Sequence, residues 1–183
     1  MFDSNSRRRI VFLWFVAWFG NGHTLPNAVF AYDVVIVGGS LSGLSAALTL
    51  GRSHRDVLVV DHHDHRHGNH ACNRFQAQSY NLLTHDGVPP RQLQALARQN
   101  VEAYPSVHLQ QGNVTRIHTA RALTTGTSTS TWTRLTFTVE TSSGDTFQAK
   151  KLILATGMKD VLPETLVGIE ECWGKTVIHC PYW

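Results

Sequence analysis

Tyr32-Asp-Val-Val-Ile-Val-Gly-Gly-Ser-Leu-Ser-Gly43 is the stretch that decides the fold. Up to Gly38 it is an almost continuous β-branched apolar run, which is typical of a strand buried on both faces of a parallel sheet. Helix-forming residues follow as far as Leu50, and a second apolar run, from Asp56 to Asp61, ends in a carboxylate. The order of strand, glycine turn, helix and strand predicts a βαβ unit.

The glycine turn has the features of a dinucleotide-binding site. Gly38 permits a tight turn, and Gly43 lets the helix lie close to the sheet. Such a turn leaves amide groups unpaired at a helix N-terminus, where the helix dipole favours a pyrophosphate. Asp61 is spaced to accept hydrogen bonds from a ribose diol. Ser40 replaces the middle glycine of the usual pattern, and the alternative interpretation is a βαβ unit whose turn is only structural.

Length and composition are those of one globular domain. The chain has 183 residues, of which 16% are charged and 42% are hydrophobic, and this is enough for one substantial core. Much of the formal net charge of +3 comes from the arginines at positions 7–9, so nothing predicts nucleic-acid binding. Three cysteines do not make a disulfide framework.

Residues 1–31 have the pattern of a leader. The arginines precede an apolar run from Ile10 to Phe19, and Val29-Phe-Ala31 has small residues where a signal peptidase would cleave. As a helix the run would span about 15 Å, half of a hydrocarbon core of about 30 Å, so no stable membrane span is expected. A signal peptide would direct the protein to the secretory pathway. The alternative is an unprocessed extension, or a wrongly placed start codon, on a cytoplasmic protein.

The rest of the chain first continues the parallel pattern and then departs from it. We expect a polar connection over 62–89, a helix starting at the prolines at 89–90, and a third parallel strand near Leu109. The apolar stripe of that helix is Leu93, Leu96, Ala97 and Val101. Alternating apolar positions then predict antiparallel strands over 113–118, 131–140 and 146–149, a loose hairpin loop over 120–131, and a last buried strand over 151–157. The expected fold class is α/β, a Rossmann-like parallel sheet with an inserted antiparallel β-meander.

Four segments in this order resemble the FAD-dependent thioredoxin reductase-like flavoproteins, which are class II pyridine nucleotide-disulfide oxidoreductases and include dithiol oxidases. The segments are Val34–Ala47, Asn73–Gly87, Leu154-Ala-Thr-Gly157 and Glu171–Tyr182. The resemblance implies that residues 32–183 form the N-terminal part of an FAD-binding domain. This part is incomplete, because the family's nicotinamide domain and its second glycine fingerprint do not follow.

The resemblance implies FAD as cofactor, with NAD(P)H as an electron donor in full-length relatives. The residues that it implies for the cofactor are Gly38, Gly39, Ser40, Leu41, Ser42 and Gly43 at the pyrophosphate, Asp61 at the adenosine ribose, Val114 at the adenine, Ala155, Thr156 and Gly157 close to the cofactor, and Asn73 with Leu83–Asp86 along the flavin side.

Cys180 matches one cysteine of the family's redox-active Cys-x-x-Cys pair and is the candidate catalytic residue. Trp183 ends the sequence, so the resolving cysteine is missing from it, and the alternative interpretation is that Cys180 is inert. In an oxidising compartment, Cys172 could pair with Cys180.

Five histidines lie close together at positions 62, 63, 65, 67 and 70. Alternate residues of an extended loop face one way, which would allow a zinc- or nickel-type cluster. The simpler interpretation is a solvated polar insert, and we predict no metal site because the pattern implies no fixed ligand geometry.

The expected function is electron transfer between NAD(P)H or a dithiol and a disulfide or oxygen, via FAD. Its partner would be a small dithiol or disulfide, and the family allows a homodimer. One alternative is a non-catalytic, truncated nucleotide-binding remnant. A second is a small NAD-dependent enzyme, which the predicted meander and the lack of a Tyr-x-x-x-Lys pair disfavour.

Overall fold

The computed structural model describes residues 30–62, 77–125 and 131–178. Its first half is the predicted parallel unit, with β1 and β2 paired in parallel and β2 paired in parallel with β3. The elements are β1 (Phe30–Val37), α1 (Leu41–Arg52), β2 (Val57–Asp61), α2 (Pro90–Glu102) and β3 (Val107–Gln111). Pro90 occupies the first helical position of α2, where a missing backbone N–H costs nothing. The parallel unit and the helix start at the prolines are therefore confirmed.

The second half adds β4 (Val114–Thr125), β5 (Thr131–Thr141), β6 (Thr146–Leu154) and the short α3 (Ile169–Cys172). All six strands belong to one sheet in the order β3-β2-β1-β6-β5-β4. β6 is parallel to β1, while β5 and β4 are antiparallel to their neighbours. A mixed Rossmann-like sheet with an antiparallel part, as expected, is confirmed.

The boundary between the parallel and antiparallel parts differs from the prediction. The strands expected over 146–149 and 151–157 are one continuous strand, β6, which ends at Leu154. Its N-terminal half pairs on one side with β5, from Phe137↔Ala149 to Glu140↔Thr146, and on the other side with β1. The lysines at 150 and 151 interrupt the apolar pattern without interrupting the strand, because backbone pairing to β1 continues on both sides of them.

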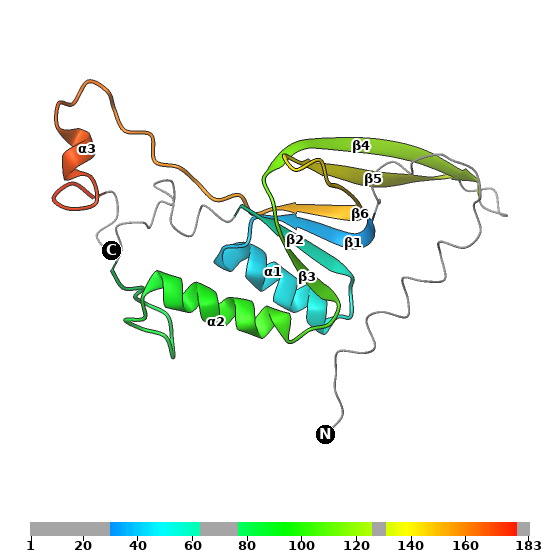
Figure 1. The fold of residues 1–183 in the computed structure, drawn as a ribbon, viewed down its shortest axis with the longest axis horizontal. Helices are drawn as coiled ribbons and strands as arrows, with labels where there is room; N and C mark the ends of the chain where they lie inside the picture. Colours follow the sequence, from blue (N-terminus) through cyan, green and yellow to red (C-terminus); the bar gives the residue numbers. More distant parts are fainter. Residues whose placement is uncertain (1–29, 63–76, 126–130, 179–183) are drawn as a thin grey trace.

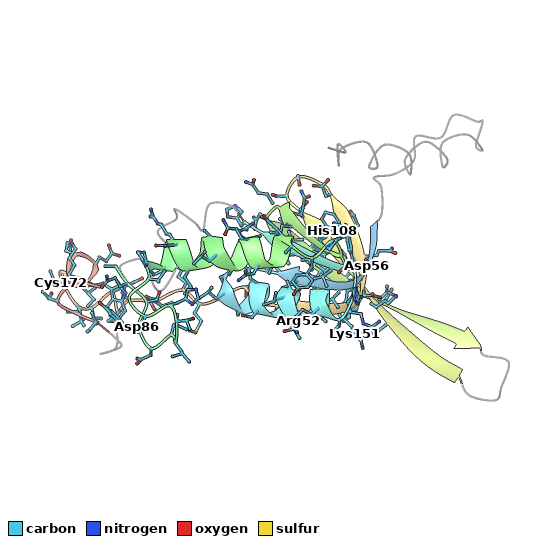
Figure 2. The ribbon with its side chains drawn as sticks, turned by 90° about the horizontal axis from the view of Figure 1, so that it is seen from below. Arg52, Asp56, Asp86, His108, Lys151 and Cys172 are labelled. Atoms are coloured by element: carbon cyan, nitrogen blue, oxygen red, sulfur yellow. The ribbon has the colours of Figure 1, made fainter. Side chains whose placement is uncertain are left out.

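The loop expected over 120–131 is also wrong in part. β4 continues to Thr125 and β5 begins at Thr131, with Ala120 paired to Thr136 and Thr125 paired to Thr131. Threonine is β-branched and favours strands, so a Thr-rich stretch extends the hairpin instead of ending it. Residues 120–125 and 131–136, here called the distal arm, pair only with each other, and Figure 2 shows this arm projecting away from the body of the molecule.

The sheet has a hydrophobic cluster on each face. On one face, Ile36 and Val59 are buried against Leu44 of α1 and Val101 of α2. Figure 1 shows both helices lying side by side along this face. On the other face, Val35 and Leu58 are buried with Val139 of β5 and further residues of β6. This two-sided burial explains why β1 and β2 read as continuous apolar runs.

Two features concern the ends of the described chain. β1 begins at Phe30, with backbone pairs Phe30↔Phe147 and Ala31↔Gln148, so the leader boundary expected after residue 31 falls inside this strand. Beyond β6, an extended segment carries α3 well away from the sheet (Figure 1). Among the described residues, no helix has the length and apolar character needed to cross a bilayer.

Candidate functional site

The turn from β1 to α1 is built around Gly38, whose φ is +106°. A Cβ at this position would overlap the carbonyl oxygen of Ala155, so the clash would be with backbone and could not be relieved by a rotamer change. The Gly38 amide donates to the carbonyl of Val60 at 2.8 Å, which ties the turn to β2. Only glycine satisfies both the positive φ and the close approach.

The first turn of α1 presents free amides. Ser40, the N-cap residue, is extended and makes no side-chain capping bond. The first helical hydrogen bond to it runs from the Leu44 amide to the Ser40 carbonyl at 2.9 Å, so the amides of Leu41, Ser42 and Gly43 precede any carbonyl that the helix could offer. A Cβ on Gly43 would overlap the carbonyl oxygen of Gly38. An uncapped helix N-terminus behind a tight glycine turn is a ready site for a phosphate group.

Asp61, the last residue of β2, faces this turn. Its Oδ1 accepts a hydrogen bond from the Gly39 amide at 3.0 Å, and its side chain is only 12% exposed. A Cβ on Gly39 would lie 2.7 Å from the Asp61 carboxyl carbon, which explains the second glycine of the pair. The amides of Gly38 and Gly39 are therefore used within the protein, and the amides left for a ligand begin at Ser40.

Two side chains of α2 that the sequence analysis did not single out complete the turn. The Gln94 side-chain amide donates to the Gly39 carbonyl at 3.1 Å. The Arg98 guanidinium forms an ion pair with Asp61, with Nη2 at 2.9 Å from Oδ2. Gln94 and Arg98 are one helical turn apart, and that i,i+4 spacing beside the apolar stripe is the signal that could have identified them.

A second turn, Ala155 to Gly157, adjoins the first. The Ala155 amide donates to the Val37 carbonyl at 2.8 Å, which extends the pairing of β6 with β1. Thr156 and Gly157 are exposed, and Gly157 has a φ of +74°. The structure thus brings Ala155 against the glycine turn and leaves Thr156 and Gly157 open to solvent at the same sheet edge.

A polar cavity of about 480 Å³ lies beside Asp61, at the carboxyl ends of β2 and β3. It is lined by His62, Gln110, Gln111, Gly112, Asn113, Ser142 and Ser143. The Gly112 amide donates to the Asp61 carbonyl at 3.0 Å, which holds the two sides of this region together. Val114 follows Asn113 at the start of β4 and packs, partly buried, on the second hydrophobic cluster.

The predicted flavin-side loop is a compact turn. Asp86 accepts a hydrogen bond from the Asn81 amide at 2.7 Å, which supports a turn-forming role for this carboxylate. Asn81 and Thr84 have φ values of +61° and +72°. Thr84 is β-branched, so this conformation is strained. Leu83 at the loop tip is 95% exposed.

Several predicted residues cannot be placed. Asn73, Cys180 and four of the five clustered histidines lie outside the described residues. Cys172, at the end of α3, is a free and half-buried cysteine. Within residues 30–62, 77–125 and 131–178, no group of His, Cys, Asp or Glu is arranged to hold a metal ion.

Two residues near the start of β1, away from the glycine turn, have shifted pKa values. Burial, with a contribution from the nearby Asp56 charge, raises the pKa of Tyr32. A hydrogen bond from Lys150 holds the pKa of Asp33 below its ordinary value of 3.8. Both residues precede the part of β1 that leads to the glycine turn, so neither shift acts on the site itself.

Known proteins are similar to this chain in sequence and in fold. The profile of the pyridine nucleotide-disulphide oxidoreductase family matches residues 32–181. A probable thioredoxin reductase of Arthroderma benhamiae is 35% identical over 82% of this chain and 34% of its own length. A thioredoxin reductase of Claviceps purpurea is 30% identical over 82% of this chain and 41% of its own length.

The same holds for solved structures. An oxidoreductase from Agrobacterium tumefaciens superposes with a TM-score of 0.65 at 39% identity, over 84% of this chain and 45% of that one. The chain therefore spans less than half the length of these relatives. With the glycine turn, the acid that ends β2 and the mixed sheet all in place, the chain belongs to the pyridine nucleotide-disulphide oxidoreductase family, with relatives that are thioredoxin reductase-like.

Proposed function

We propose that this chain binds FAD through its ADP half and is the FAD-binding part of a thioredoxin reductase-like oxidoreductase. The observation that carries the proposal is the pairing of an uncapped helix N-terminus with the carboxylate of Asp61 across a turn made of Gly38 and Gly39. The amides from Ser40 to Gly43 would hold the pyrophosphate. Asp61 would hold the adenosine ribose.

The geometry fits such a group on three counts. Ser40 does not cap the helix, so the first-turn amides have no competing acceptor in their own N-cap side chain. A Cβ atom at Gly38 or Gly43 would collide with backbone atoms. Glycine at both positions therefore allows the turn to lie close against the sheet. A polar cavity continues from His62, beside Asp61, to Asn113, beside Val114, and its position at the carboxyl ends of parallel strands is where dinucleotides bind in such folds. We assign the adenine to this end.

Bound FAD would supply two-electron redox chemistry between a reduced nicotinamide or dithiol and a disulfide or oxygen. The part of the protein described here would bind the cofactor and orient it. Ala155, Thr156 and Gly157 would line its path, and Cys180, as a thiol with His179 beside it in sequence, remains the candidate redox cysteine. Because the chain spans less than half of its relatives, the full reaction is a proposal for the complete protein.

The test is a titration of the purified chain with FAD, followed by flavin absorbance and fluorescence, and by competition with ADP. We expect stoichiometric binding that ADP displaces, because the contacts are to the ADP half. A change of Gly43→Ala should abolish binding, since its Cβ would collide with the Gly38 carbonyl beside the phosphate site.

Gly51→Ala is the matched control. Gly51 lies on the same helix at the opposite end, where an added Cβ would lie 2.7 Å from a Val107 methyl carbon. This variant should lose stability but keep its affinity for FAD. A chain that ignores both FAD and ADP, or that binds NAD while ignoring FAD, would overturn the proposal. Loss of flavin colour on addition of NADPH would extend it to electron transfer.

A further inference from the structure

Two polar side chains of α2 hold groups of the glycine turn and its acid in place. Gln94 and Arg98 lie one turn apart on the helix, and both are only partly exposed. Gln94 donates to the Gly39 carbonyl, and Arg98 donates to the carboxylate that accepts from the Gly39 amide. We infer that Gln94 and Arg98 are positioning residues that preset the turn for a ribosyl pyrophosphate, an inference that rests on the proposed function.

Arg98 acts on the ribose side through Asp61. An ionised carboxylate offers about four lone-pair positions to donors. The Gly39 amide takes one on Oδ1 and the Arg98 guanidinium takes one on Oδ2. One donor on each oxygen fixes the plane of the carboxylate. One position on each oxygen then remains, which matches the two hydroxyl groups of a ribose diol.

The Asp61–Arg98 pair is mostly buried, with the two side chains 12% and 19% exposed. The cost of desolvating both charges offsets much of the attraction between them, so such a pair adds little to the stability of the fold. The pair does hold the Asp61 carboxylate in a fixed orientation before a ligand arrives. Because the acceptor is already oriented, ligand binding does not have to order a mobile side chain, which would cost conformational entropy.

Gln94 acts on the phosphate side through the peptide that joins Gly39 to Ser40. In a trans peptide the C=O and the N–H point in opposite directions. Because Gln94 holds the Gly39 carbonyl toward α2, the Ser40 amide of the same peptide is held pointing away from α2. The Ser40 amide is the first of the amides left free for a ligand. Gln94 therefore orients the Ser40 N–H, a hydrogen-bond donor to the phosphate, without touching the ligand.

The experiment compares two ligands on the chain of 183 residues, by isothermal titration calorimetry. ADP carries the ribose diol, and 2′,3′-dideoxy-ADP lacks it while keeping the pyrophosphate. Arg98→Met should weaken ADP binding about tenfold, the usual scale for losing a charge-assisted contact, and should change dideoxy-ADP binding by less than about twofold. Gln94→Met should lower the affinity for both ligands to the same extent, because Gln94 acts through the Ser40 N–H that would bind the phosphate.

Arg91→Met is the matched control, since Arg91 is an exposed arginine on the same helix. It should leave the affinity for both ligands unchanged. Arg98→Lys should recover part of the ADP affinity, because an ammonium keeps the charge but not the planar fork. Should Arg98→Met fail to fold, the ratio of the two affinities is read from Arg98→Lys instead.

The outcomes separate the two proposals. Suppose that the unsubstituted chain binds ADP, and that Arg98→Met lowers the affinity for both ligands equally or changes neither affinity. Arg98 then does not act through the ribose acceptor, and this inference is overturned while the proposed function stands. If the unsubstituted chain binds neither ligand, the proposed function fails and this inference fails with it.

Discussion

Single residues at the glycine turn are constrained by close neighbours, which lie just after β6, in β2 and in the turn itself. Gly38 contacts the start of the Ala155 turn after β6, Gly39 contacts Asp61 of β2, and Gly43 contacts Gly38 itself. Each added Cβ would meet backbone or a buried carboxylate, and neither can move aside as a flexible side-chain end can. The turn is therefore defined by close approach as much as by backbone conformation.

Gly38→Ala and Gly87→Ala separate these two effects. Both residues have positive φ, +106° and +78°, but a Cβ at Gly87 would meet nothing within 4 Å, while one at Gly38 would overlap the Ala155 carbonyl. We expect Gly87→Ala to lower the free energy of unfolding by about 1–2 kcal/mol from backbone conformation alone. Gly38→Ala should cost about 1–3 kcal/mol more, from overpacking. Urea unfolding followed by circular dichroism measures both, and equal losses would show that the close approach does not matter.

Asp33 predicts a pH dependence at the other end of β1. Its carboxylate accepts hydrogen bonds from Lys150 at 2.6 Å and from the Asp56 amide at 3.3 Å, and the bond from Lys150 holds its pKa below 3.8. A carboxyl whose pKa is lower in the folded state contributes stability above its unfolded pKa, and loses that contribution as the pH falls through the folded value. Asp33→Asn should therefore be less stable than the parent at pH 7, and the gap should close below pH 3.8. A gap in urea midpoint that stays constant from pH 7 down to pH 3 would contradict this assignment.

At the scale of elements, β6 joins the two halves of the sheet. It extends the parallel ladder beside β1 and at the same time starts the antiparallel ladder with β5. It also delivers Ala155 to the glycine turn, so the site depends on a strand more than a hundred residues away in sequence. The distal arm of β4 and β5 lies beyond the last residues that pair with β6.

Excision of the distal arm tests this division. Ala120 and Thr136 are directly opposite in the ladder, so an Asn-Gly turn between them closes a shortened hairpin. We expect the urea midpoint and the affinity for ADP to stay unchanged, because a two-stranded ribbon with no third partner contributes little stability.

A change inside the paired region is the comparison for the excision. Val139 of β5 is fully buried, and Val139→Ala should lower the free energy of unfolding by about 0.5–3 kcal/mol. If excision of the arm cost as much as this substitution, the arm would have a structural role that its pairing does not reveal.

At the scale of the whole molecule, the glycine turn, the Ala155 turn and the polar cavity all lie at the carboxyl ends of the parallel strands. Ligand sites in open α/β sheets form at this edge, because the loops that leave the strands there converge on one crevice. The segment after the Ala155 turn leaves this edge without regular structure until α3. Its apolar residues are highly exposed to solvent: Met158 is 82%, Val161 is 90% and Val167 is 104% exposed.

Limited proteolysis tests how this segment is held. Thermolysin cleaves before apolar residues, so we expect the earliest cuts within the described chain to fall between Met158 and Val167, where the backbone is exposed and lacks ladder hydrogen bonds. The equally apolar residues 57–60 of β2 are buried and should resist until the chain unfolds. Intact-mass spectrometry identifies the fragments, with the urea-unfolded chain as the control that is cut at both places. Resistance of the 158–167 segment would mean that another surface covers it in solution.

The local features of the fold could be predicted from the sequence. The buried runs of β1 and β2, the glycine turn and the proline start of α2 each depend on residues adjacent in the chain, so their patterns survive without knowledge of the rest. The same is true of Asp61, because its distance along the chain from the turn is set by one helix and one strand. The length of the β4–β5 hairpin does not follow from the sequence, because Thr-rich composition is compatible with both a loop and a strand. Cross-strand pairing decides between them.

By itself, the sequence determined that a tight turn must precede a helix at Gly38 and that an acid must end the next strand, since both are consequences of local backbone geometry. Only the tertiary structure decided which groups hold that acid and that turn. Arg98 reaches Asp61 across 37 positions and Gln94 reaches Gly39 across 55, and β6 becomes one strand through its register with β1. Contacts of this range depend on how helices and strands pack in three dimensions, and no periodicity in the chain records them.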